Sequence, residues 1–153
     1  MSARRWLVLG LALLLALALV SCGSKPVQQG MATKDGLTFL ASTVTNEKAG
    51  TVAVTVIMTN GAGDALYLCA PEQAGAEGAV AVYLDMTLSG GESEYAALPE
   101  TGLIRWMSVD ARESYSETCV FTGTLPATLT VTVQTAAHYS EAFTETVVEL
   151  ELK

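Results

Sequence analysis

Histidine and cysteine, which most often hold metals or act as nucleophiles, are scarce: the 153 residues include one histidine and three cysteines. A structural zinc site needs about four such ligands at recognisable spacings, and neither Cys69 nor Cys119 has a Cys-x-x-Cys neighbour. A Ser–His–Asp hydrolase would have to use His138, and no Gly-x-Ser-x-Gly elbow is present to supply its serine. The sequence therefore predicts no metal, no cofactor and no catalytic residue.

Positive charge is also scarce, because eight lysines and arginines stand against 16 aspartates and glutamates. The sequence has no phosphate-binding loop, dinucleotide fingerprint or basic–aromatic patch. A surface of net negative charge repels the phosphate backbone, so we expect no nucleic-acid partner. The same charge keeps a domain soluble and favours cationic partners.

Only one long apolar run occurs, over residues 6–20, and it directly follows the pair Arg4 and Arg5. The run covers 15 residues, whereas a membrane-spanning helix needs roughly 20. A polar stretch, residues 21–29, follows at once. This order of a positive start, a short apolar run and a polar end predicts a cleaved signal peptide.

The end of the apolar run, Leu19-Val20-Ser21-Cys22, resembles the lipobox of bacterial lipoproteins at all four positions. The resemblance implies that the Cys22 thiol receives a diacylglyceryl group and that a signal peptidase cleaves before it. We therefore expect a chain held at the cell membrane by its N-terminal lipid, facing outside the cytoplasm. The alternative is an ordinary secretory signal in which the cysteine has no role.

The pattern divides the chain into three parts: a signal peptide over 1–21, a lipidated cysteine and flexible tether over 22–36, and one domain over 37–153. The tether is predicted because residues 24–35 are polar and lack apolar periodicity. Cleavage would remove Arg4 and Arg5, which leaves six basic residues against 16 acidic ones and a formal charge of −10.

Apolar residues alternate with polar ones in several segments, which predicts about eight β-strands and no helix after residue 22. The segments are 37–43, 51–59, 65–69, 79–86, 103–107, 118–123, 128–134 and 148–152. Residues 60–64, Asn-Gly-Ala-Gly-Asp, are typical of a tight turn. We therefore expect 51–59 and 65–69 to be adjacent antiparallel strands joined by a short loop.

The strand number and spacing favour an all-β domain, a single immunoglobulin-like Greek-key β-sandwich. Residues 54–68 and 112–125 loosely resemble a broad group of bacterial immunoglobulin-like domains, in which an Asn-Gly-type turn and a later Ser-rich segment each lead into a strand. The resemblance implies the fold only. Trp106 is the candidate for a core anchor of such a sandwich.

Cys69 and Cys119 are the two cysteines that remain after lipidation of Cys22. An even pair in an exported domain favours a disulfide, which would close a loop of 50 residues. Chain-entropy theory assigns such a loop about 4 kcal/mol. The alternative is a pair of buried thiols.

The long segment 87–102 holds Tyr95 and Leu98 among acids and glycines, and Tyr115 precedes a later strand. Exposed aromatic side chains in loops on a rigid sandwich are common binding elements, so these three residues are the candidate ligand contacts. The alternative is that the tyrosines cap the ends of the core.

Three functions fit these observations. The favoured one is a binding or accessory module of the cell envelope, with an envelope protein or an exported peptide as its partner. The second is a cell-wall-directed hydrolase that uses carboxylates in or near loops, such as Glu92, Glu94, Glu100, Asp110, Glu113 and Glu117. The third is a protease-inhibitor-like sandwich acting through 87–102.

Overall fold

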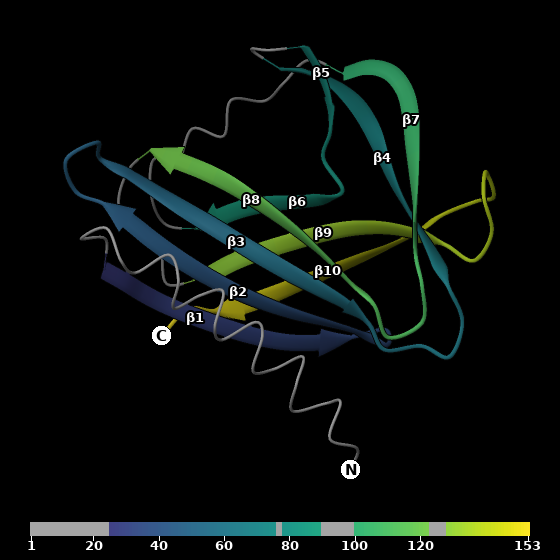
Figure 1. The fold of residues 1–153 in the computed structure, drawn as a ribbon, viewed down its shortest axis with the longest axis horizontal. Coiled ribbons are helices and arrows are strands. Elements are labelled where there is room, and N and C mark those ends of the chain that lie inside the picture. Colours follow the sequence, from purple (N-terminus) through teal and green to yellow (C-terminus); the bar gives the residue numbers. More distant parts are fainter. Residues whose placement is uncertain (1–24, 76–77, 90–99, 123–127) are drawn as a thin grey trace.

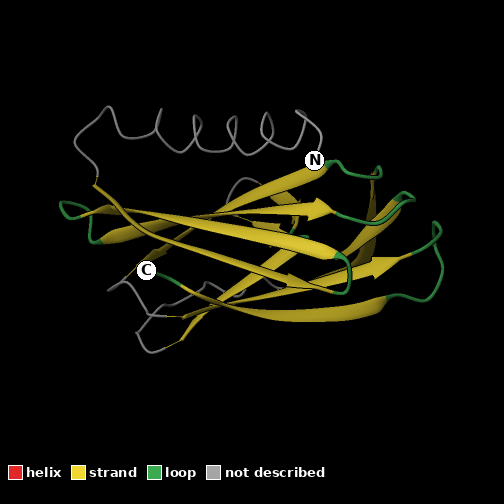
Figure 2. Ribbon diagram, turned by 90° about the horizontal axis from the view of Figure 1, so that it is seen from below, coloured by secondary structure: helices red, strands yellow, loops and turns green. Residues whose placement is uncertain are grey.

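The computed structural model describes residues 25–75, 78–89, 100–122 and 128–153, and these form two facing β-sheets (Figures 1 and 2). One sheet has four strands in the order β1-β2-β3-β8: β1 (Lys25–Lys34), β2 (Leu37–Asn46), β3 (Thr51–Asn60) and β8 (Ser114–Thr122). The other contains β4 (Leu66–Gly75), β5 (Gly78–Ala81), β6 (Leu84–Ser89), β7 (Glu100–Val109), β9 (Thr128–Ala136) and β10 (Thr144–Glu151). None of the described residues forms a helix able to span a membrane.

The structure confirms the predicted alternation on β3: every second side chain points into the space between the two sheets and is buried there. On β3 the inward residues Val52, Val54, Val56 and Met58 are at most 1% exposed. The facing sheet contributes the matching inward residues of β6, β9 and β10, which are Leu84, Met86, Leu88, Leu129, Val131, Val133, Val148 and Leu150. Because successive side chains of a strand point to opposite faces, one apolar residue in two suffices to build this core.

The coarse prediction of an all-β, two-sheet architecture is confirmed, whereas its details differ. The described residues form ten strands rather than about eight, partly because the expected strand 79–86 is divided between β5 and β6. An immunoglobulin domain places its third strand in the opposing sheet. Here β1, β2 and β3 are consecutive neighbours in one sheet, so this order does not confirm the immunoglobulin-like Greek-key subtype.

The expected pairing of β3 with β4 is wrong, because the two strands lie in different sheets. The reason is Asn60, the fully buried last residue of β3. Its side-chain amide donates to the carbonyl oxygens of Asp64, Val109 and Asp110 at 2.9, 3.1 and 3.3 Å. These bonds join the crossing from β3 to β4 to the crossing from β7 to β8, so residues 61–65 form an arch between the sheets rather than a hairpin.

The expected tether is also wrong over most of its length, because residues 25–34 form β1, which pairs with β2 along its length apart from one irregularity. Its inward positions are small or polar, which is why the sequence shows no apolar alternation there. The main chain of Gln29 exchanges two hydrogen bonds with Lys153, of 2.9 and 3.0 Å, beyond the end of β10. A Cβ atom on Gly30 would lie 2.7 Å from the Glu151 carbonyl oxygen, so this approach requires glycine.

The outer faces of the two sheets differ in charge. The outward residues of the four-stranded sheet, which we call the uncharged face, are Gln29, Met31, Thr33, Thr38, Leu40, Ser42, Val44, Asn46, Thr51, Ala53, Thr55, Ile57, Thr59, Ser114, Ser116, Thr118, Val120 and Thr122. The outward residues of β6, β9 and β10, which we call the acidic face, are Asp85, Thr87, Thr128, Thr130, Thr132, Gln134, Glu145, Val147, Glu149 and Glu151. The net negative charge of the chain is therefore unevenly distributed.

Candidate functional site

Of the three residues predicted to contact a ligand, only Tyr115 lies among the described residues, and Tyr95 and Leu98 lie outside them, as does Cys22. Tyr115 is half-buried on β8 and packs against the core. Its hydroxyl donates to a carboxylate oxygen of Glu117 at 3.3 Å, and its ring meets that of Tyr83 edge-on with centroids 5.6 Å apart. Tyr115 therefore caps the core, as the alternative interpretation held.

Glu117 lies within β8, not in a loop, and one of its carboxylate oxygens accepts three hydrogen bonds. The oxygen that accepts the Tyr115 hydroxyl also accepts the main-chain N–H groups of Tyr83 and Leu84, at 3.1 and 2.9 Å. Burial raises the pKa of the Glu117 carboxyl, and the three hydrogen bonds oppose this shift. Burial, followed by the charge of Glu117, raises the pKa of the Tyr115 phenol above its usual range.

This cluster of Glu117, Tyr115 and Tyr83 joins β8 of one sheet to the start of β6 in the other. The two N–H groups lie where β5 has ended and β6 begins, so the carboxylate satisfies donors that would otherwise lack a partner there. A carboxyl of raised pKa beside a phenol has the composition of an acid–base pair. Its hydrogen bonds, however, are explained by a structural role, because they link β8 of one sheet to the start of β6 in the other.

The predicted Cys69–Cys119 disulfide is absent from the structure, which has both residues as thiols. Cys119 faces the core from β8. Cys69 is the direct partner of Trp106 across β4 and β7, on the outer side of the other sheet, where burial raises the pKa of its thiol. The two side chains lie on opposite sides of the six-stranded sheet, so they are not placed to form a bridge: Cys69 is a buried thiol and Cys119 a half-buried one.

The remaining candidate metal ligands and catalytic carboxylates are not grouped into a site in the parts of the chain that are described. No group of three or more His, Cys, Asp or Glu side chains there is arranged to hold an ion. Glu92 and Glu94 lie outside the described residues, and so does the side chain of Glu100. Asp110 and Glu113 are exposed in the turn between β7 and β8.

Three aromatic side chains, Tyr67, Trp106 and Tyr139, form a contiguous group that the sequence analysis did not single out; we call it the aromatic cluster. The ring centroid of Tyr139 lies 5.5 Å from that of Trp106 and 6.1 Å from that of Tyr67. The Tyr139 ring is tilted by 53° against that of Trp106 and meets that of Tyr67 edge to face at 70°. Trp106 is half-buried in this cluster and not in the core between the sheets, which corrects its expected role as a core anchor.

The aromatic cluster is built by two adjacent strands and a loop. Tyr67 and Trp106 project from β4 and β7, which pair with each other, and Tyr139 comes from the loop between β9 and β10. Tyr139 is 66% exposed although two rings support it, and Phe143 in the same loop is 44% exposed. A large apolar side chain held at the surface by other rings is a feature of recognition sites.

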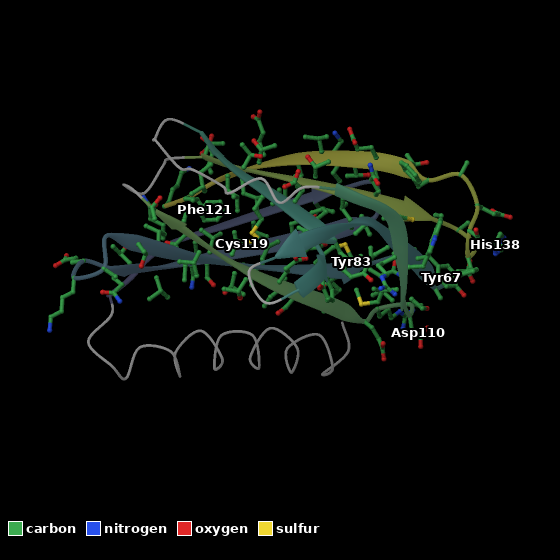
Figure 3. All side chains as sticks on the ribbon, turned by 90° about the horizontal axis from the view of Figure 1, so that it is seen from above. Tyr67, Tyr83, Asp110, Cys119, Phe121 and His138 are labelled. Carbon is green, nitrogen blue, oxygen red and sulfur yellow. The ribbon has the colours of Figure 1, made fainter. Side chains whose placement is uncertain are left out.

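A shallow, open depression lies beside the aromatic cluster. It is lined by residues of the arch and the start of β4, and by residues of the end of β9, the β9–β10 loop and the start of β10. These are Ala62, Asp64, Ala65, Leu66, Thr135, Ala136, Ala137, Glu141, Ala142 and Thr144. Figure 3 shows Tyr67, His138 and Asp110 at this end of the sandwich, with Phe121 toward the other end. His138 is exposed there, and its carbonyl oxygen accepts a bond of 3.3 Å from the Glu141 main chain that shapes the loop.

Comparison with known proteins adds no function: no protein-family model and no curated protein sequence matches the chain significantly. The site therefore stands on its geometry. Its three rings come from positions far apart in the sequence, and only the fold brings them together. One signal was readable: Tyr139 and Phe143 lie in a short segment between two alternating strands, where a buried role is unexpected.

Proposed function

We propose that this protein is a lipid-anchored binding module of the bacterial cell envelope and that the aromatic cluster is its ligand-contact surface. The observation that carries the proposal is the 66% exposure of Tyr139 on a base formed by Tyr67 and Trp106. Aromatic rings supply large contact areas with little loss of side-chain entropy, and two strands hold this base in place. The proposal needs only a two-sheet scaffold, so the immunoglobulin-like subtype, still a prediction, is not required.

The position of β1 supports a specific arrangement at the membrane. Only Gly23 and Ser24 separate Cys22 from Lys25, so a lipidated Cys22 would lie within about 11 Å of the strand's first residue. Lys25 pairs with Thr45, at the end of the sandwich that carries the β2–β3 turn. A strand of ten residues extends roughly 33 Å from there to the β1–β2 turn.

The aromatic cluster belongs to the end far from the anchor. Leu37, at the start of β2, pairs with Asn60, and the arch that follows Asn60 leads into β4 just before Tyr67. The lipid would therefore fix one end of the sandwich at the bilayer, while the other end presents its aromatic side chains to the surroundings. A long flexible tether is unnecessary for this presentation.

The charges near the aromatic cluster favour a partner with cationic and apolar groups. Asp64 and Glu141 line the depression, and Glu145 begins the acidic face nearby. Cations are attracted both to carboxylates and to the faces of aromatic rings. A basic segment of an envelope protein or of an exported peptide has the required chemistry.

A site-specific crosslink tests the proposed surface on the intact lipidated chain. A photoreactive phenylalanine analogue would replace Tyr139 in one variant and Val147 in another, and both would be irradiated in cell envelopes. Val147 is the matched control because it is 39% exposed on the acidic face. We expect a specific adduct from position 139 only, and at least tenfold weaker binding of the captured partner to Tyr139→Ala. Equal adducts at both positions, or unchanged binding by Tyr139→Ala, would refute the assignment.

The anchor has its own test. Radiolabelled fatty acid such as palmitate is expected to enter the wild-type protein and not the Cys22→Ser variant, which should also leave the membrane fraction. The hydrolase and protease-inhibitor alternatives rest on residues 87–102 and neighbouring carboxylates, and most of that segment lies outside the described residues. No observation on the described residues favours either of them.

A further inference from the structure

The uncharged face is unusual for this chain, whose acids outnumber its bases by 16 to eight. It extends over the outer side of β2, β3, β8 and of β1 from Gln29 onward, and none of the outward side chains described there is charged. Exposed sheet faces and edges usually carry lysine or other charges that prevent association with other chains. The opposite side of the sandwich does so, with Asp85, Glu145, Glu149 and Glu151.

Six hydroxyl groups of this face are already paired with one another. The hydroxyl oxygens of Thr59 and Ser114 lie 2.8 Å apart, and so do those of Thr55 and Thr118. Thr33 and Thr38 form a third pair at 3.2 Å. A hydroxyl that is bonded within its own sheet loses less when water is removed than one that is not. These rows can therefore be covered by another protein surface at small cost.

Apolar side chains run between the hydroxyl pairs. Met31, Leu40 and Ile57 are opposite one another across β1, β2 and β3, between the row of Thr59 and the row of Thr55. On β8, Val120 is 66% exposed, and Met31 at the other side of the sheet is 67% exposed. Covering them would contribute favourable burial at both borders of the face as well as at its centre.

We infer that the uncharged face is the contact surface of a homodimer, in which the same face of a second copy covers it. On the acidic face a second copy would bring acids toward acids, whereas the uncharged face meets itself without charge repulsion. Four strands of about ten residues make a face of roughly 20 by 30 Å, or about 600 Å² in projection. That is of the same order as the ~800 Å² of accessible surface that each partner buries in a standard interface.

A two-fold axis parallel to the strands gives this dimer a consistent place at the membrane. Both Lys25 ends then lie at the same end of the assembly, and both aromatic clusters lie at the other. This orientation rests on the proposed lipid anchor, because only the anchor fixes which end meets the bilayer. The dimer contact itself does not depend on the anchor.

The test is the association state of the full chain, measured by sedimentation equilibrium in detergent for the lipidated protein and without detergent for the Cys22→Ser form. Ser116→Lys places a charge on the face at an exposed position opposite Ile57. Thr130→Lys is the matched control at the middle of the acidic face. We expect a dimer that Ser116→Lys weakens at least tenfold and that Thr130→Lys leaves unchanged.

The outcomes separate this inference from the proposed function. Dimerisation of the Cys22→Ser form with loss of membrane binding would support both the contact and the anchor. A dimer that depends on Cys22 would overturn the sheet contact and leave the anchor intact. A monomer at every concentration, or a dimer broken only by Thr130→Lys, would overturn the inference. If Ser116→Lys does not fold, Val120→Lys at its 66% exposed position takes its place.

Discussion

The two sheets meet at two borders, and different chemistry joins them at each. At the β1–β10 border the main chains of Gln29 and Lys153 exchange hydrogen bonds of 2.9 and 3.0 Å. At the β8–β6 border the side chain of Glu117 accepts the N–H groups of Tyr83 and Leu84. The first border is therefore held by main-chain groups, which do not depend on the type of side chain, and the second by one titratable side chain.

The difference teaches which changes each border tolerates. Backbone groups of two strands come this close only if no side chain separates them, so the β1–β10 border depends on a missing Cβ atom at Gly30. A side-chain bridge leaves the strands farther apart and accommodates the rings of Tyr83 and Tyr115. The β8–β6 border therefore depends on the length and the charge of the side chain at position 117.

The largest expected effect follows from the smallest change, Gly30→Ala. Glycine-to-alanine substitutions at unstrained sites usually stabilise a protein by reducing the entropy of the unfolded chain. Here the added Cβ atom meets the Glu151 carbonyl oxygen at 2.7 Å. We therefore expect a loss of about 3 kcal/mol of unfolding free energy, measured by denaturant titration.

Gly63→Ala is the control for this prediction, because a Cβ atom there has no neighbour within 4 Å and the φ angle is not positive. It should leave the stability unchanged or slightly raised. If Gly30→Ala behaved like Gly63→Ala, the close approach of β1 to β10 would be disproved.

At the other border, Glu117→Ala removes the acceptor of three donors. The N–H groups of Tyr83 and Leu84 are partly buried, so water replaces the carboxylate incompletely. We expect a loss of about 1.5 kcal/mol in unfolding free energy. Glu149→Ala removes the same charge from an exposed position on β10 and should cost less than about 0.5 kcal/mol. Equal effects of the two variants would argue against the bridge.

The contrast between the borders also explains why some strands could be predicted from the sequence and β1 could not. The strands β3, β9 and β10 were predictable because β-branched and aliphatic residues occupy every second position of each. The strand β1 was missed because its inner positions hold Gln28, Gly30 and Ala32, which the close approach of β10 keeps small or polar. Asp35 and Gly36, both with positive φ, form the tight turn that would have revealed it.

The connection after β3 was misread for a different reason. The letters of residues 60–64 are those of a hairpin turn, and local turn chemistry does not determine which sheet the next strand joins. The decision is made by Asn60, whose bonds to Val109 and Asp110 depend on residues about fifty positions away. The aromatic cluster was missed on the same ground, because Tyr67, Trp106 and Tyr139 become neighbours only in the folded chain.

The smallest expected effect is a difference in pH dependence. Because burial raises the pKa of Glu117 above its ordinary value of 4.5, the folded protein holds this proton at pH values where the unfolded chain has released it. The contribution of Glu117 to stability is then fully present below pH 4.5 and is lost as the pH rises through the folded-state pKa. This is opposite to the usual behaviour of a salt-bridged carboxylate.

Glu117→Gln separates the charge of this bridge from its shape. Glutamine keeps an oxygen acceptor for the Tyr83 and Leu84 N–H groups and cannot ionise. We expect wild type to lose unfolding free energy relative to Glu117→Gln as the pH rises from 4.5 to neutrality, measured by denaturant titration at each pH. Gly30→Ala should follow wild type at a constant offset, because main-chain bonds do not titrate in this range. If instead the wild type gained stability relative to Glu117→Gln with rising pH, the carboxylate would be better stabilised at its border than in water. The two borders would then differ in geometry alone and not in their response to charge.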